Sequence, residues 1–207
     1  MNRRMILCAL GLSPLAFLSA KIPMYNPTME ILIKRWKKSE EYTLAVLESM
    51  PAETIEFRPT EEQFSFAQHF LHLGFINVTY FGILVDSKTY KDFYELMEAD
   101  FLIQPPDGIN VFQPDSLQKR SPDENKALVQ DYISKTYAYV LSSLNLVNDT
   151  DLPKGLEKEK PSYLSRHSNL DLIIRGESHT AHHRAQAIAY LRMNGIRPPG
   201  YTVNNTF

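Results

Sequence analysis

The sequence predicts an all-α protein, a four-helix bundle with long connections. Four segments carry apolar residues at three- and four-residue spacing, which is typical of amphipathic helices. Helix-start signals precede three of these segments, and no convincing run of alternating apolar and polar residues indicates a sheet. A chain of 207 residues is long enough for one well-buried domain and short for two.

The first helix is expected over residues 28–50. Pro51 follows this segment and should end the helix, because proline donates no backbone N–H and clashes with the preceding turn. Within the segment, the residues that recur at helical spacing and form one buried stripe are Leu32, Trp36, Thr43, Val46, Leu47 and Met50.

Capping signals indicate where the second and third helices begin. Ser65 and Gln68 form an S-x-x-Q capping box, so a helix should start there and run to about residue 85. Ser121 precedes a proline in the first helical position and Glu124 in the third, which predicts another start. The spacing of apolar residues continues that helix to about residue 144.

The last helix should begin near residue 168 or 169 and end at Asn194-Gly195, a common helix stop. Between the second and third helices, residues 86–120 are too many for a simple turn, and a short helix is expected at residues 90–97. Residues 148–166 are polar and irregular. Connections this long are unusual in compact domains, and in a bundle they could cover one end or wall a pocket.

Residues 1–20 have the order of a secretory signal peptide: a positive start, a short apolar stretch and a small residue, Ala20, at the end. The prediction is an exported protein, periplasmic or extracellular, with the bundle domain over residues 21–207. A buried N-terminal helix and an uncleaved anchor are the alternatives. The single cysteine, Cys8, lies in this segment, so a processed chain would have no thiol for a disulfide, for nucleophilic attack or for a metal.

The composition limits the partners. A net charge of −2 offers no basic surface for nucleic acid. After the first twenty residues, no apolar stretch is long enough to predict a membrane span. A small-molecule substrate is the expected partner, and a homodimer is one assembly that the sequence allows.

Histidines supply the candidate site. His179 and His183 are spaced i, i+4 on the last predicted helix, which places both imidazoles on one face and suits two ligands of one metal ion. His182 lies well round the helix and is expected at the surface. Because the sequence has no His-Glu-x-x-His arrangement, this pair does not come with the glutamate base of the zinc peptidases.

A third ligand would have to come from another segment. His69 and His72 on the second predicted helix are the clustered candidates, and His167 is the remaining outlier. Periodicity alone ranks His69 slightly higher, because it lies nearer the centre of the buried stripe. A packed, hydrogen-bonded core histidine is the alternative interpretation of His69.

Two stretches resemble the DinB-like family. Residues 65–73 (SFAQHFLHL) are similar to its second-helix pattern, in which a serine lies seven residues before a ligand histidine. Residues 179–186 (HTAHHRAQ), followed by residues 190–192 and 195–199, resemble its closing signature. Ala185 stands where glycine is common. The resemblance spans roughly residues 28–201 and implies a DinB-type four-helix bundle.

The resemblance also implies a metal site. On the match of these motifs, the ligands of a divalent metal ion would be His72, His179 and His183, which favours His72 over the periodicity-based choice of His69. Imidazole ligands suit several metals, among which zinc and nickel are the leading candidates. Many members of the family are described as metal-dependent hydrolases, and others with a similar fold use low-molecular-weight thiols.

Three hypotheses for function follow from this. The first is a metal-dependent enzyme that hydrolyses a small molecule, since three imidazoles leave open positions on the ion. The second is a thiol-dependent S-transferase, and the third is a metal- or ligand-binding bundle without catalysis. Gln68 and Gln186 could orient ligands or water, although Gln68 is also expected to cap its helix. No carboxylate is placed beside the histidines, since Glu177 points away from them.

Overall fold

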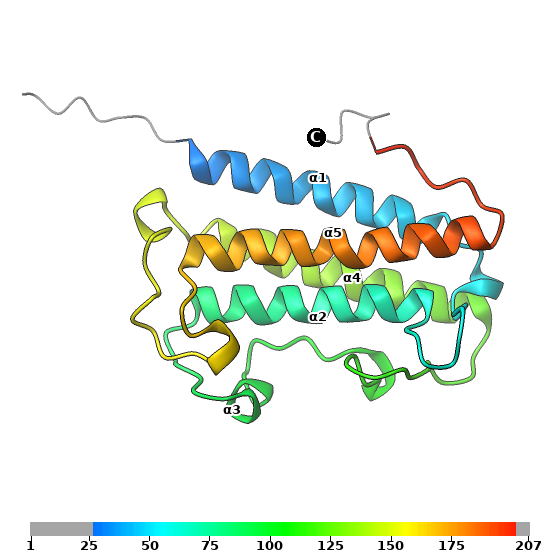
Figure 1. Ribbon diagram of the computed structural model, residues 1–207, viewed down its shortest axis with the longest axis horizontal. Coiled ribbons are helices and arrows are strands. Elements are labelled where there is room, and N and C mark those ends of the chain that lie inside the picture. Colours follow the sequence, from blue (N-terminus) through cyan, green and yellow to red (C-terminus); the bar gives the residue numbers. More distant parts are fainter. Residues whose placement is uncertain (1–26, 202–207) are drawn as a thin grey trace, which may run out of the picture.

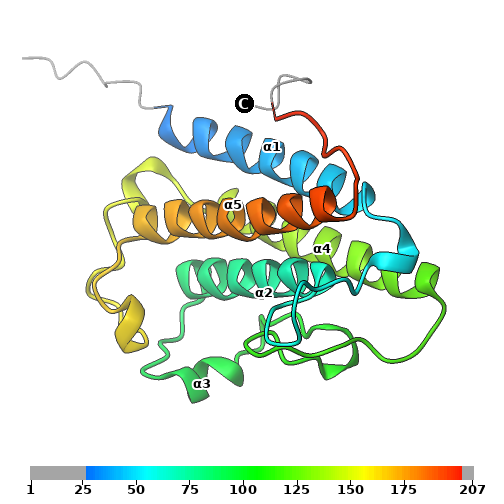
Figure 2. The same ribbon diagram turned by 45° about the vertical axis from the view of Figure 1, so that its right-hand side comes forward.

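The computed structural model describes residues 27–201, which form a bundle of four long helices (Figures 1 and 2). No strand occurs within residues 27–201, and the predicted all-α bundle is confirmed. Its helices are α1 (Thr28–Glu48), α2 (Phe66–Val85), the short α3 (Phe93–Met97), α4 (Pro122–Leu144) and α5 (Asn169–Met193). Four short 3₁₀ turns complete it: η1 (Ala52–Thr54), η2 (Pro106–Gly108), η3 (Asp149–Asp151) and η4 (Ser162–Leu164).

The four long helices pack in a ring. α2 packs against both α4 and α5, and α1 packs against the same two helices from the other side. Figure 1 shows that α1 and α5 run in one direction, whereas α2 and α4 run in the other. The α2–α5 interface is therefore antiparallel, so residues early in α2 face residues late in α5.

The helix starts agree with the capping signals. Ser65 Oγ accepts the Gln68 backbone N–H at 3.2 Å, and Gln68 Oε1 accepts the Ser65 N–H at 3.3 Å, which completes the expected capping box. Equivalent boxes at Ser121 and Ser168 start α4 and α5. Each box satisfies backbone donors that no helical hydrogen bond can reach.

Two helix boundaries differ from the prediction. α1 ends at Glu48 rather than at residue 50, because the chain tightens there: the Met50 N–H bonds to the Leu47 carbonyl, three residues back, at 3.3 Å. α3 begins at Phe93 rather than at residue 90, because Asp92 caps it and accepts the Glu95 N–H at 2.9 Å.

The interior of the bundle brings α1 close to the α2–α5 interface. The Trp36 ring of α1 is 1% exposed and meets Phe81 of α2 edge-on at 5.0 Å between ring centroids. Gly176 of α5 allows this approach, because a Cβ there would lie 3.3 Å from both the Trp36 ring and Asn77 Oδ1. Asn77 Nδ2 donates to Thr180 Oγ1 at 2.8 Å, which ties α2 directly to α5.

The two long connections lie on different parts of the bundle. The connection between α2 and α4 carries α3 and η2 along the outer side of α2, and the connection between α4 and α5 covers one end (Figure 1). Within the described residues, no helix has the length and apolar character needed to span a membrane. The predicted signal peptide over residues 1–20, with Cys8, lies outside the described residues.

Candidate metal centre

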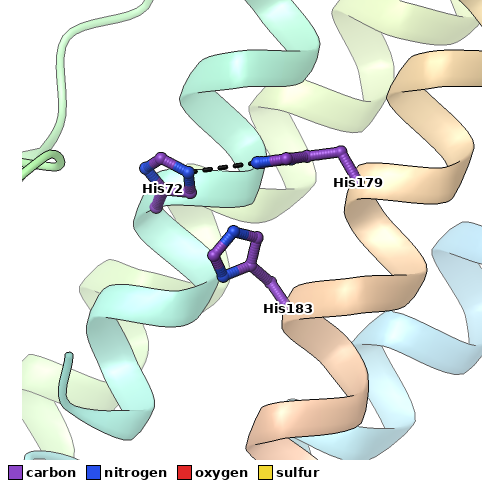
Figure 3. Close-up of side chains that lie close together, drawn as sticks. All are labelled: His72, His179 and His183. Carbon is purple, nitrogen blue, oxygen red and sulfur yellow. Dashed lines mark hydrogen bonds between the residues drawn. The ribbon is translucent and has the colours of Figure 1, made fainter. Parts of the chain in front are cut away.

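Three imidazole rings meet where α2 faces α5 (Figure 3). His72 Nε2 lies 3.1 Å from His179 Nε2, and His183 lies one turn along α5 from His179. One nitrogen of each ring can be chosen so that all three lie within 4.8 Å of one another. The structure thus brings together His72, His179 and His183, the residues that the resemblance implied.

A backbone carbonyl fixes the orientation of His72. Its Nδ1 lies 2.6 Å from the Val111 carbonyl oxygen, in the connection after α3. A carbonyl only accepts hydrogen bonds, so Nδ1 carries the proton and donates it. Nε2 of His72 therefore carries a lone pair, and it is the nitrogen that lies 3.1 Å from His179 Nε2. A backbone acceptor behind the ligating ring is the usual arrangement for a metal-binding histidine.

His69 has a different place from the one that periodicity suggested. Its Nδ1 lies 3.0 Å from Nδ1 of His183, on the side of that ring away from His72 and His179. The His69 ring is 2% exposed and packs against Tyr190 at 5.2 Å between centroids. His69 therefore lies behind His183, and within the described part of the chain it is outside the three-nitrogen group.

The rings are electrically neutral near pH 7. Burial, together with a smaller contribution from neighbouring imidazoles, lowers the pKa of His183 to about 2 and that of His179 to about 3. Burial also lowers the pKa of His72, although the bond to Val111 acts in the opposite direction. A neutral imidazole keeps one nitrogen lone pair available for a metal ion.

Aromatic side chains surround the cluster. Phe64 lies with its ring centroid 5.4 Å from that of His72 and 6.4 Å from that of His183. Phe112 meets His72 edge-on at 5.9 Å. Phe64, Val111 and Phe112 were missed in the sequence because they lie outside the helices, where no periodicity indicates which residues contact the histidines. The one available signal was the unusual length of the connection that carries Val111 and Phe112.

Gln68 joins the capping box to this connection. While its side-chain oxygen caps α2, its Nε2 donates to the carbonyls of Asn110 at 3.3 Å and Gln113 at 2.9 Å. These carbonyls flank Val111, so Gln68 holds the segment that orients His72. Gln186, the other glutamine considered from the sequence, lies 2.6 Å from the exposed His182 instead.

Carboxylates are remote from the three rings. Glu177 forms an ion pair with Arg35 of α1 at 2.7 Å, as its position on the helix suggested. Among the described residues, no aspartate or glutamate oxygen joins the three-histidine group. His167, the outlying histidine, contacts Arg175 at 3.0 Å.

The donor set fits a divalent ion. Nitrogen ligands about 2.0–2.1 Å from a tetrahedral zinc ion are about 3.3 Å apart, and the 3.1 Å between His72 and His179 is close to that value. The third ring, His183, lies with its centroid 4.5 Å from each of the other two. Three neutral imidazoles of this spacing are the chemistry that zinc and nickel accept.

Fold and site together define a helical bundle with a three-histidine cluster that fits metal binding. The family model described as the DinB superfamily matches residues 35–187, which is most of the chain. The chain therefore belongs to the DinB superfamily, and the resemblance noted in its motifs is confirmed. A search of curated proteins found no match to the chain.

Replacing Gln68 by glutamate tests how the connection is held. Gln68→Glu keeps the oxygen that caps α2 but sets a second oxygen against the carbonyls of Asn110 and Gln113. We expect the free energy of unfolding to fall by about 1–3 kcal/mol, because the fully buried side chain loses both of its donated hydrogen bonds to these carbonyls. Hydrogen exchange at residues 110–113 should become faster, whereas the first turn of α2 should remain protected.

Gln186→Glu is the matched control, since among the described residues the Gln186 amide hydrogen-bonds to the exposed His182; it should change stability by less than about 0.5 kcal/mol. Unchanged exchange over residues 110–113 in Gln68→Glu would show that the glutamine does not hold this segment.

Proposed function

We propose that this protein binds a divalent metal ion, zinc or nickel, through His72, His179 and His183, and that it hydrolyses a small molecule. One observation carries the proposal: three neutral ring nitrogens lie within 4.8 Å of one another, one of them turned inward by the Val111 carbonyl. Structural zinc sites are closed by four protein ligands, whereas catalytic sites use three and leave a position open. Three histidines match the second pattern.

An ion bound there would supply a Lewis acid that polarises a carbonyl group and lowers the pKa of water. The chain's own residues set the conditions around it. His69 Nδ1 lies 3.0 Å from His183 Nδ1, and this contact holds the His183 ring in position. Phe64 and Phe112 give the cluster apolar neighbours, which strengthens electrostatic interactions by lowering the local dielectric constant.

In the proposed hydrolysis, a water oxygen bonds to the carbonyl carbon of an ester or amide. The bond from that carbon to the leaving group breaks, and the leaving group takes up a proton released by the water. No described carboxylate stands beside the rings to move this proton, so it would pass to solvent or directly to the leaving group.

The lack of a carboxylate beside the three histidines, among the described residues, supports a second candidate function. Hydrolytic metal sites commonly use a carboxylate as general base, and none joins the described cluster. This favours a bundle that binds a metal ion without catalysis as the alternative. The two functions share the metal site and differ in turnover.

Metal analysis tests the site itself. Protein purified without a histidine tag should retain zinc or nickel near one ion per chain, measured by plasma mass spectrometry after dialysis. His72→Ala, His179→Ala and His183→Ala should each lose it, because two imidazoles and water bind far more weakly. His182→Ala is the control, since this exposed ring lies on the same helix outside the group. Stoichiometric metal in all three ligand variants would contradict the assignment.

Replacing His69 tests its position behind His183. We expect His69→Phe to weaken metal affinity by about 10–100-fold, because the hydrogen-bond partner that orients the ligand is lost. His69→Asn should restore much of the affinity, since its side-chain oxygen can accept from His183 Nδ1. Competition with a chromophoric chelator gives the affinities, and circular dichroism checks the fold. Equal affinity in His69→Phe and wild type would show that His69 only packs.

A turnover assay separates the two functions. Metal-loaded protein should hydrolyse members of a panel of small esters and amides, lose this activity on chelation and regain it when zinc or nickel is restored. His72→Ala should remain inactive after the metal is added back, and His182→Ala should remain active. Stoichiometric metal without turnover would favour the binding bundle. Turnover only when a thiol and an electrophile are supplied together would favour an S-transferase.

A further inference from the structure

An apolar cavity lies next to the histidine cluster. Its volume is about 220 Å³, and one wall is formed by Phe75, Ile76 and Thr79 of α2. These residues follow His72 by three, four and seven positions, so all four share one face of the helix. The cavity thus begins about one turn, roughly 5.4 Å, along α2 from His72. Phe93, Leu96 and Met97 of α3 also line the cavity, as does Tyr163 of η4.

Phe112 contacts both the cluster and the residues of the cavity. Its ring centroid lies 5.9 Å from that of His72 and 5.7 Å from that of Phe75, and it meets Phe93 of α3 at 5.5 Å. One ring therefore borders both the cluster and the cavity. A molecule with its reacting group at the histidines could extend past Phe112 into this space.

The lining selects an uncharged group. None of the described residues that line the cavity is charged, and the Thr79 hydroxyl already donates to the Phe75 carbonyl at 3.0 Å. Tyr163 contributes the only other side-chain oxygen. A charged or strongly polar group would lose its hydration here without gaining a partner, whereas an apolar group would be transferred favourably from water.

The size limits the occupant further. A cavity of about 150 Å³ lined by apolar side chains accommodates benzene. The 220 Å³ here therefore suits one phenyl ring or a short branched alkyl group. An amphipathic helix or a long acyl chain would need a longer groove than this volume provides.

We propose that the cavity binds a phenyl-sized apolar substituent of the substrate, an ester or amide whose carbonyl group lies at the three histidines. This inference rests on the proposed hydrolase function and adds the substrate class. The apolar group would hold the substrate by burial alone, and specificity would depend on the fit between this group and the α2 and α3 walls.

Direct binding tests the cavity independently of catalysis. Fluorobenzene is titrated into wild-type protein, with and without metal, and followed by fluorine NMR. Met97→Trp should raise the dissociation constant by at least about tenfold, because a larger side chain in the wall occupies the space of one ring. Tyr94→Trp is the matched control on the same helix, since Tyr94 is 82% exposed and should leave binding unchanged. If Met97→Trp does not fold, Phe93→Ala, at a residue 38% exposed, alters the wall instead.

Turnover then tests the substrate class. Methyl phenylacetate and methyl acetate differ by the phenyl ring alone; hydrolysis of either releases methanol and a carboxylic acid, followed by proton release. We expect kcat/KM to be about tenfold to a hundredfold higher for the phenyl ester, and Met97→Trp to remove most of this preference.

The outcomes distinguish this inference from the proposed function. Metal-dependent hydrolysis with equal kcat/KM for the two esters would overturn the apolar subsite and leave the hydrolase standing. Fluorobenzene binding that Met97→Trp abolishes, without hydrolysis of either ester, would support the subsite and count against the hydrolase. Failure of wild-type protein to bind fluorobenzene would overturn the inference.

Discussion

The antiparallel contact between α2 and α5 determines where every residue of the histidine cluster lies. Four pairs mark its register: from the first to the last, the α2 number rises from 69 to 80 and the α5 number falls from 183 to 175. A shift of one residue in either helix would turn its side chains by about 100° and separate the rings. Gly176 and the Asn77–Thr180 hydrogen bond bring the two helices close enough for the rings to meet. The pairs are His69–His183, His72–His179, Asn77–Thr180 and Tyr80–Arg175.

This close contact carries a free-energy cost. His69 Nε2 and His179 Nδ1 are buried without a hydrogen-bond partner among the described residues. A buried polar group left unpaired costs about 1–3 kcal/mol, so apolar side chains at these positions would give a more stable bundle. A fold that keeps several imidazoles in such an environment departs from the pattern expected for stability alone, and departures of this kind concentrate at functional sites.

Local signals in the sequence were enough for the four long helices and for two of the three histidines of the cluster. The capping boxes that start α2, α4 and α5 each involve two residues only three positions apart: the serines are Ser65, Ser121 and Ser168. The i, i+4 spacing of His179 and His183 was enough to place both on one face of α5. Choosing between His69 and His72 was beyond periodicity, because they lie only about 60° apart on the helix. Their roles depend on the side from which α5 approaches and on where residues 110–113 return to α2. Both depend on the tertiary structure, which the spacing of residues along one helix does not reveal. Only the family resemblance indicated His72.

The surroundings of the cluster also bear on whether it acts on a substrate. A bundle that only held a metal ion would be expected to close the site with a fourth side-chain ligand. The described chain instead places two phenylalanines, Phe64 and Phe112, beside the three rings. Phe112 also lines the neighbouring cavity, which has no charged residue in its lining and has the volume of about one phenyl ring. Three histidines beside apolar space are the arrangement that the proposed function requires, because an uncharged organic molecule would gain from both a metal ion at the histidines and burial in the cavity.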